Sequence, residues 1–210
     1  AQTINAATEH MAGMINSLLE YFRLDSGKEM PSVKPFKLCS IAETLKTEFE
    51  PLAERKQLSF MVENQADEIA SGDKDRILSI GSNLLSNAIK FTSNGTITLV
   101  TECKESTFVL TVEDTGTGMT EEQQQRIFIP FERLGNAVTE DGFGLGLAIV
   151  ADTVKLLQGT VRVESKPGKG SRFTVCLPLP KAEETVRDEK TSMRHSLLSG
   201  SSVLAIDNNG

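Results

Sequence analysis

Hydrophobic residues near the start of the chain recur with a seven-residue spacing. From Thr3 to Asp25 they fall into two series, Ile4, Met11 and Leu18, and Ala7, Met14 and Tyr21. This spacing is typical of the a/d seam of a helix that packs on other helices. Because one such helix cannot bury its seam alone, the pattern predicts a partner helix, from elsewhere in a longer chain or from a second copy, as in a four-helix bundle. The alternative is a lone amphipathic helix docked on its own domain.

After this helix the pattern changes to that of a mixed domain. Ser26-Gly27, Pro31 and Pro35 end the helix and predict a linker over residues 29–39. Helical spacing predicts helices over about 41–55, 73–91 and 145–157, and alternation predicts strands over 58–63, 96–102, 107–114, 160–164 and 171–177. Alternating strands form a sheet that helices cover on one face. The predicted fold class is α+β, a two-layer α/β sandwich over residues 40–180.

The pattern changes again after Pro180. The run KAEETVRDEKTS is charged and nearly free of apolar residues, which predicts a flexible linker over 181–200. The segment SSVLAID predicts the first strand of a further domain over 201–210. We therefore expect the chain to be a piece of a longer protein, in which any membrane attachment belongs to parts outside this chain.

Composition narrows the class of protein. Hydrophobic residues are 39% of the chain and charged residues 24%, as in globular proteins. The net charge of −7 argues against a nucleic-acid partner, because binding to a phosphate backbone normally needs clustered positive charge. The three cysteines have no Cys-x-x-Cys spacing, and there is neither a signal peptide nor an apolar run of about 20 residues. We expect no zinc site, no disulfide framework and a cytoplasmic location.

Polar residues gather on one face of the predicted helix 73–91. At 100° per residue they lie within about 40° of one line, with apolar residues on the other side. These residues are Arg76, Ser79, Asn83, Asn87 and Lys90. A plain solvated face would use Glu or Lys, and asparagine is a poor interior helix residue. Amide oxygens suit Mg²⁺, which bridges nucleotide phosphates, so the pattern favours a magnesium–phosphate site over a solvated face.

Asp114 continues the apolar phase of the predicted strand 107–114. Its carboxylate is therefore expected on the buried side of the sheet, where an unpaired charge is costly. Gly116 and Gly118 follow and let backbone approach closely. A buried carboxylate that accepts a hydrogen bond from an exocyclic amine, such as that of adenine, explains both features. The alternative is an aspartate that caps a glycine turn.

Two further glycine-rich segments differ in the structure that they predict: one leads into a helix, and the other forms a turn. The segment Gly142-Phe143-Gly144-Leu145-Gly146 opens into a helix, which presents N–H groups to phosphate, although it is neither a Walker A nor a Rossmann sequence. Gly168-Lys169-Gly170-Ser171 alone predicts a hairpin turn. The loop Glu132–Asp141 has few apolar anchors, which favours a mobile lid.

The order of these elements is more specific than any one of them. The chain contains N-L-L-x-N-A-x-K-F at 83–91, D-x-G-x-G at 114–118, I-F-x-P-F at 127–131, G-x-G-L-G-L at 142–147 and G-x-G-S-x-F at 168–173. Together these motifs resemble the ATP-binding domain of sensor histidine kinases, a family within the wider group of gyrase-type, Hsp90-type and MutL-type ATPases. Upstream, residues 1–28 look like the second helix of the kinases' dimerisation and phosphotransfer hairpin. Downstream, 203–209 looks like the opening strand of a receiver domain, as in hybrid kinases.

The resemblance implies a function and a set of ATP-binding residues. Mg-ATP would be bound and its γ-phosphoryl group transferred to a histidine, chiefly by positioning and charge neutralisation, and then to a response regulator or receiver domain. Asn83 and Asn87 would hold Mg²⁺, and the helix 1–28 would form a homodimer. The implied ATP-binding residues are Asn83, Asn87, Lys90, Phe91, Asp114, Gly116, Gly118, Phe131, Gly142, Gly144, Leu145, Gly146 and Phe173.

The chain departs from the family at two places. The family's acceptor is a His-Glu or His-Asp pair on the first hairpin helix, whereas His10 precedes Met11 and His195 precedes Ser196. The acceptor is therefore expected upstream of Ala1, and this chain is expected to bind ATP without phosphorylating itself. At Asp207-Asn208 only one carboxylate stands where receivers show paired acidic residues.

Two alternative functions remain for the same motifs. The first is another enzyme of this fold, an anti-sigma-type serine kinase or a gyrase-like ATPase. The heptad helix before the domain and the receiver-like strand after it argue against both. The second is a non-catalytic nucleotide sensor that acts through dimerisation. Its motifs would be expected to decay at Asn87, Asp114 or the glycines, and all of these are intact here.

Overall fold

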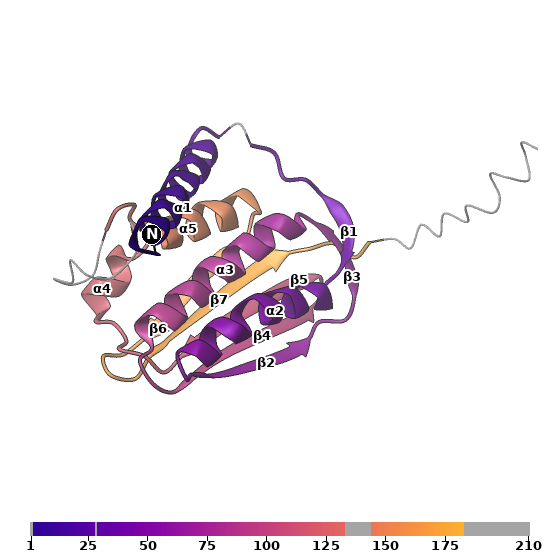
Figure 1. Ribbon diagram of the computed structural model, residues 1–210. Coiled ribbons are helices and arrows are strands. Elements are labelled where there is room, and N and C mark those ends of the chain that lie inside the picture. The colour runs from indigo at the N-terminus through magenta and orange to yellow at the C-terminus, as the bar shows by residue number, and fades with distance from the viewer. Residues whose placement is uncertain (1, 28, 133–143, 183–210) are drawn as a thin grey trace, which may run out of the picture.

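A long helix leads into a domain in which helices lie on a five-stranded sheet (Figure 1). The computed structural model describes residues 2–27, 29–132 and 144–182. Its elements are α1 (Gln2–Asp25), β1 (Lys34–Lys37), α2 (Cys39–Arg55), β2 (Ser59–Gln65), β3 (Ile69–Gly72), α3 (Lys74–Phe91), β4 (Thr96–Lys104), β5 (Thr107–Asp114), α4 (Glu121–Arg126), α5 (Gly146–Leu156), β6 (Thr160–Ser165) and β7 (Ser171–Pro178). The helices and strands predicted within 3–25 and 41–177 are all present.

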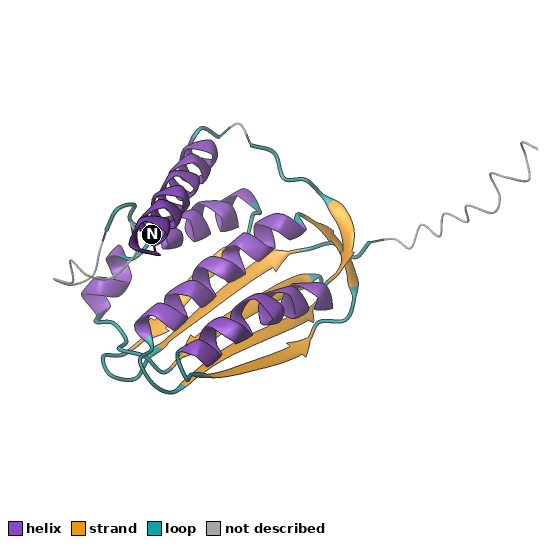
Figure 2. Ribbon diagram, viewed as in Figure 1, coloured by secondary structure: helices purple, strands orange, loops and turns teal. Residues whose placement is uncertain are grey.

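The main sheet has the strand order β2-β4-β5-β7-β6. The β2–β4 pair is parallel, and the other pairs are antiparallel. Helices α2, α3 and α5 lie over the same face of this sheet (Figure 2). The predicted two-layer α+β sandwich is therefore confirmed, and its register places Asp114 at the end of β5, opposite Ile97 and Ser171.

The core lies between this sheet and the helices. Residues of β4 and β5 alternate between buried and half-buried along most of their length, as the sequence alternation predicts. Helix α3 supplies the facing layer with Ile77, Leu84 and Leu85, all buried. Burial of each such side chain stabilises the fold by about 1.5–3 kcal/mol. The apolar side of α3 is thus fixed against the sheet, and its polar side faces away from β4 and β5.

Strands β1 and β3 and helix α4 are not predicted by the sequence. The two strands form a small antiparallel ribbon, and β1 lies within residues expected to be a linker. Each strand has only four residues, too few for a periodicity to show, and Pro35 argued against a strand there. Helix α4 has no buried residue, so it has no apolar stripe, although its Thr120–Gln123 capping box was a readable signal.

The chain after β7 also joins the ribbon. The N–H of Ser71 donates to the Pro180 carbonyl (2.9 Å), and the N–H of Ala182 donates to the Ile69 carbonyl (3.1 Å). Residues 180–182 therefore lie along the edge of β3 opposite β1, at one end of the molecule (Figure 1). The predicted strand within 201–210, and the charged linker beyond residue 182, lie outside the described residues.

Helix α1 packs beside α5, over the helical layer (Figure 1). Its end at Asp25 confirms the predicted helix. The large apolar side chains that it exposes are Met11, Ile15, Leu18, Leu19 and Phe22. In the predicted seam Tyr21 is instead half-buried, and the side chains of Ile4, Ala7 and Met14 are outside the described set. Within the described residues, no helix has the length and hydrophobicity needed to cross a bilayer.

Candidate functional site

The polar face of α3 meets the start of α5. Asn83 and Asn87 are half-buried, and the Asn83 amide nitrogen donates to the Ser79 carbonyl (2.9 Å). This bond leaves the Asn83 amide oxygen facing Gly146. A methyl group at Gly146 would lie 2.9 Å from that oxygen and 3.9 Å from the Asn87 amide nitrogen. A side chain at position 146 would displace the Asn83 amide, so the glycine keeps α5 close to the two asparagines, and the structure brings two separate sequence motifs together.

The first turn of α5 is suited to an anion. No side chain caps it, and Leu145 at its N-cap is buried with 3% exposed. The first N–H groups of a helix lack partners within the helix and carry partial positive charge. Because Gly146 lies beside Asn83, these donors are placed next to the amides of α3.

The two ends that flank residues 133–143 lie against each other. The Phe131 N–H donates to the Gly144 carbonyl (3.0 Å), and a methyl group at Gly144 would lie 2.6 Å from the Glu132 carbonyl oxygen. Phe131 and Gly144 both have a positive φ. The Phe131 side chain is 58% exposed. Gly142 and most of the loop predicted to be a lid lie outside the described residues.

Asp114 is buried on the helical side of the sheet, as its phase predicts. Its side chain is 6% exposed, its carboxylate accepts a hydrogen bond from the Gly116 N–H (2.8 Å), and the backbone N–H of Ser171 on β7 also favours its ionised form. Burial raises the pKa of this carboxyl above 3.8, and the charge of Glu113 adds to the rise, while the two N–H groups oppose it. A carboxylate has about four lone-pair sites, so the bond from Gly116 leaves it able to accept a further hydrogen bond.

Two glycine turns close around Asp114. A methyl group at Gly116 would collide with the Phe91 carbonyl, and one at Gly170 would collide with the Asp114 carbonyl. The Gly168 N–H donates to the Thr117 carbonyl (2.7 Å), which ties the two turns together. The β6–β7 connection is the predicted hairpin turn, and it also forms one wall around Asp114.

The remaining predicted residues lie at different depths. The Lys90 ammonium is 4.8 Å from the centre of the Phe91 ring, whose side chain is 37% exposed. Phe173 lies in the hydrophobic core opposite Val112, two residues along β7 from Ser171. Gly118 has a positive φ and packs on the Lys166 backbone.

Sequence reasoning missed the role of Ser171 in this site. Its backbone N–H lowers the pKa of Asp114 because β5 and β7 pair in the register that places the two residues opposite each other. Ser171 stood in the last of the motifs, but local periodicity carries no information about strand pairing. The Thr92 hydroxyl, just after α3, is buried and has no hydrogen-bond partner among the described residues.

The site has two chemically different ends. Amide oxygens, Lys90 and an uncapped helix N-terminus suit a phosphate chain with its metal ion, and a buried carboxylate suits an amine on a flat base. These features define an ATP-binding domain with its helices on one face of a mixed sheet. Residues 72–181, just over half of the chain, match the family described as histidine kinase-, DNA gyrase B- and HSP90-like ATPase. The chain belongs to this family.

The curated relatives of the chain include sensor kinases. It is 33% identical over 197 residues to the autoinducer 2 sensor kinase/phosphatase LuxQ of Vibrio parahaemolyticus. This match covers 89% of this chain and 23% of LuxQ. It is 33% identical over 180 residues to the sensor histidine kinase RcsC of Escherichia coli, covering 84% of this chain and 19% of that protein. The chain thus spans about a fifth of the length of these relatives.

Solved structures share the fold. The crystal structure of full-length ShkA in complex with AMPPNP has a TM-score of 0.77 and 26% identity, and the match covers 89% of this chain and 39% of ShkA. The histidine kinase AdeS of Acinetobacter baumannii has a TM-score of 0.71 and 21% identity, covering 85% of this chain and 83% of AdeS. The second match concerns the fold alone.

Proposed function

We propose that this chain is the ATP-binding catalytic region of a two-component sensor histidine kinase. It binds Mg-ATP and transfers the γ-phosphoryl group to a histidine outside this chain, from which the group passes to an aspartate of a response regulator or receiver domain. The observation that carries the proposal is the position of Asn83 and Asn87 against Gly146, with Asp114 buried nearby between two glycine turns. The sensor kinases among the relatives and the AMPPNP complex of ShkA support it.

Each end of the site has its own task in this proposal. The Asp114 carboxylate accepts from the adenine amino group, and Gly116 and Gly118 leave room for the base. Asn83 and Asn87 hold Mg²⁺ and phosphate oxygens, and Lys90 and the first turn of α5 contact phosphate. Mg²⁺ neutralises phosphate charge when bound. Because phosphoryl transfer asks little covalent chemistry of the protein, these residues act by orientation and electrostatic stabilisation.

Helix α1 is the proposed dimerisation element. Its exposed apolar residues recur at helical spacing on the side away from its contacts with α5 and Phe131. A second copy of α1 is the partner that the heptad spacing favours. The kinase would then act as a homodimer.

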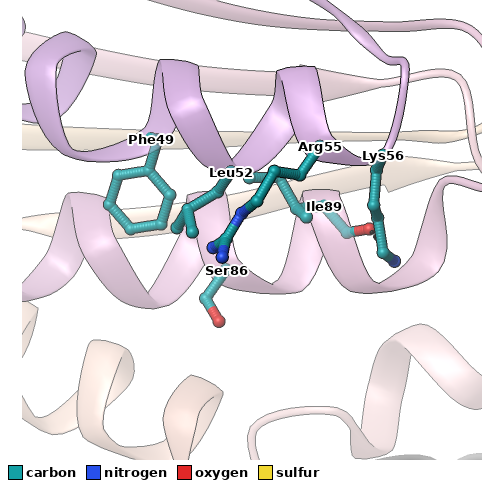
Figure 3. Close-up of a pocket in the computed structure, with 6 residues that line it drawn as sticks. All are labelled: Phe49, Leu52, Arg55, Lys56, Ser86 and Ile89. Atoms are coloured by element: carbon teal, nitrogen blue, oxygen red, sulfur yellow. Dashed lines mark hydrogen bonds between the residues drawn. The ribbon is translucent and has the colours of Figure 1, made fainter.

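Mg-ATP binding to the 210-residue chain tests the proposal. Asn87→Ala should weaken binding at least tenfold in calorimetry, about 1.4 kcal/mol, because it removes an amide ligand. The matched control is Ser86→Ala on the same helix. Ser86 is exposed and lines a hollow of about 260 Å³ between α2 and α3 (Figure 3). The control should bind ATP normally.

Two results would contradict the proposal. One is a wild-type chain that fails to bind Mg-ATP. The other is radiolabel from γ-labelled ATP on His10, because the proposed acceptor lies outside this chain. A longer kinase that includes the acceptor histidine should become labelled, and Asn87→Ala should abolish that labelling.

A further inference from the structure

The polar face of α3 is divided between two tasks. Its C-terminal half carries Asn83 and Asn87, which face Gly146 at the proposed phosphate end of the site. Its N-terminal half carries Arg76 and Ser79, which contact α1 and the segment after it. The sequence pattern placed all of these residues on one line and did not separate them.

Arg76 holds two carboxylates at once. Its guanidinium pairs with Glu29 in the segment after α1 and lies 3.7 Å from the Glu20 carboxylate on α1 itself. The Ser79 hydroxyl also donates to Glu20 (3.0 Å). The Arg76 side chain is only 19% exposed, so these interactions are partly shielded from water. A network of this kind is stronger than an isolated surface pair, and the planar guanidinium gives it direction.

The backbone beside Arg76 is held as well. Asp73 caps α3 by accepting from the Arg76 N–H (3.1 Å), and its other carboxylate oxygen accepts from the Ser32 N–H (2.7 Å). The segment that leaves α1 is therefore attached to the first turn of α3 at Glu29 and again at Ser32. This turn therefore adds two attachments to the contacts that α1 makes with Ser79, α5 and Phe131.

This docking is joined to the nucleotide site through a rigid helix. The Ser79 carbonyl accepts from the Asn83 amide, while the Ser79 hydroxyl donates to Glu20. Arg76 lies two helical turns before Asn83, a rise of about 10 Å, so it is separated from the amide ligands. With its charge already paired to Glu20 and Glu29, Arg76 is suited to docking rather than to phosphate binding.

We propose that Arg76 is a positioning residue that sets where the ATP-binding domain rests on helix α1, by holding Glu20 and Glu29 together. It takes no part in nucleotide binding. Its value to phosphotransfer rests on the proposed function, because the domain must present ATP to a histidine on the helical bundle. Its docking role rests only on the contacts described above.

The chain carries its own reporter of this docking. Tyr21 follows Glu20, and its ring lies edge-on to Phe131 with ring centres 6.2 Å apart. It is the only tyrosine, and there is no tryptophan. The near-UV circular dichroism of tyrosine therefore reports the contact between α1 and the domain. Hydrogen exchange of residues 18–27 gives a second measurement.

The experiment compares Arg76→Glu with Lys46→Glu in the 210-residue chain. Arg76→Glu should lower the tyrosine band by half or more and speed exchange at 18–27 at least threefold, with ATP affinity within twofold of wild type. Lys46→Glu breaks an exposed pair with Glu50 on α2 and should change neither signal. Combining Arg76→Glu with Glu20→Arg and Glu29→Arg should restore both signals, because the charges are exchanged.

The outcomes separate the two proposals. Unchanged tyrosine and exchange signals in Arg76→Glu, or no recovery in the charge-exchanged variant, would overturn the positioning role. So would a tenfold loss of ATP affinity in a folded Arg76→Glu chain, since Arg76 would then belong to the nucleotide site. A wild-type chain that does not bind ATP would refute the proposed function. The tyrosine and exchange signals would still test the docking role, because they do not depend on ATP binding.

Discussion

Asp114 is an ionisable residue in a buried position, where its negative charge does not stabilise the nucleotide-free domain. Burial raises its pKa, although the backbone N–H groups of Gly116 and Ser171 act in the opposite direction. A perturbed carboxyl beside two glycine turns is expected of a functional group rather than a structural one. The buried carboxylate destabilises the nucleotide-free chain, but it provides a buried hydrogen-bond acceptor for the amine of a bound ligand.

The raised pKa of Asp114 predicts opposite pH dependences for stability and binding. A carboxyl whose folded-state pKa lies above its unfolded value contributes stability that is lost as pH rises through the folded pKa. The free energy of unfolding of the nucleotide-free chain should therefore lose this contribution in the window above 3.8. ATP affinity should rise in that window, because the adenine amino group needs the ionised acceptor. Denaturant titration and calorimetry across this range measure the two quantities.

Asp114→Asn is the control for that prediction. The variant removes the titrating group, so the difference between wild type and variant isolates Asp114 from the titration of the nucleotide itself. At neutral pH the variant should bind ATP at least tenfold more weakly. Identical pH profiles for wild type and variant would show that Asp114 does not titrate as its burial implies.

Side-chain direction was the part of the site that the sequence predicted best. The helical line of Asn83 and Asn87 and the strand phase of Asp114 follow from fixed periods of 3.6 and 2 residues. The partners of these residues depend on pairing between distant segments, so neither the Ser171 N–H nor the Gly146 contact followed from local pattern. Phe173 shared a motif with Ser171, yet the strand buries it in the core.

At the scale of elements, length decided what could be predicted. Helix α3 and the pair β4–β5 are long enough for several repeats of their period, and the structure contains them. Strands β1 and β3 depend on each other and on residues 180–182, which are far away in the sequence. No local signal marks such a ribbon, so the sequence predicts a linker where β1 lies.

The ribbon predicts different effects for proline at two adjacent positions. Ala182→Pro removes the N–H that donates to the Ile69 carbonyl, whereas the Lys181 N–H has no hydrogen-bond partner among the described residues. Ala182→Pro should lower the free energy of unfolding by about 1 kcal/mol, the net value of one hydrogen bond. Lys181→Pro should change it by less than about 0.5 kcal/mol. Denaturant unfolding of both variants gives the comparison, and equal losses would mean that the outgoing segment is not held by that bond.

At the scale of the whole molecule, α1 has two different faces. One side docks on the domain through Glu20 and Tyr21, and another exposes a stripe that includes Ile15 and Phe22. The sequence predicted the need for a partner helix and also offered docking on the domain as the alternative. The structure shows the docking, and the exposed stripe keeps the partner helix as a prediction.

The exposed stripe predicts a concentration-dependent homodimer. Ile15→Glu places a charge within it and should weaken the dimer at least tenfold in sedimentation equilibrium, because burying an unpaired charge is costly. Asn16→Glu adds the same charge one residue along, about 100° around the helix, and should leave the dimer intact. A wild-type chain that stays monomeric at high concentration, or equal effects of the two variants, would rule out this face.

The shared strand β3 also determines how the domain can be connected. The incoming strand β1 and the outgoing residues 180–182 lie on its two edges, so they are separated by about two strand spacings, roughly 10 Å. Both segments run antiparallel to β3, so the chain enters the ribbon beside Gly72 and leaves it beside Ile69, at the other end of the same strand. Strand β3 therefore joins the incoming and outgoing connections of the ATP-binding domain, so a displacement of this one strand would move both of them.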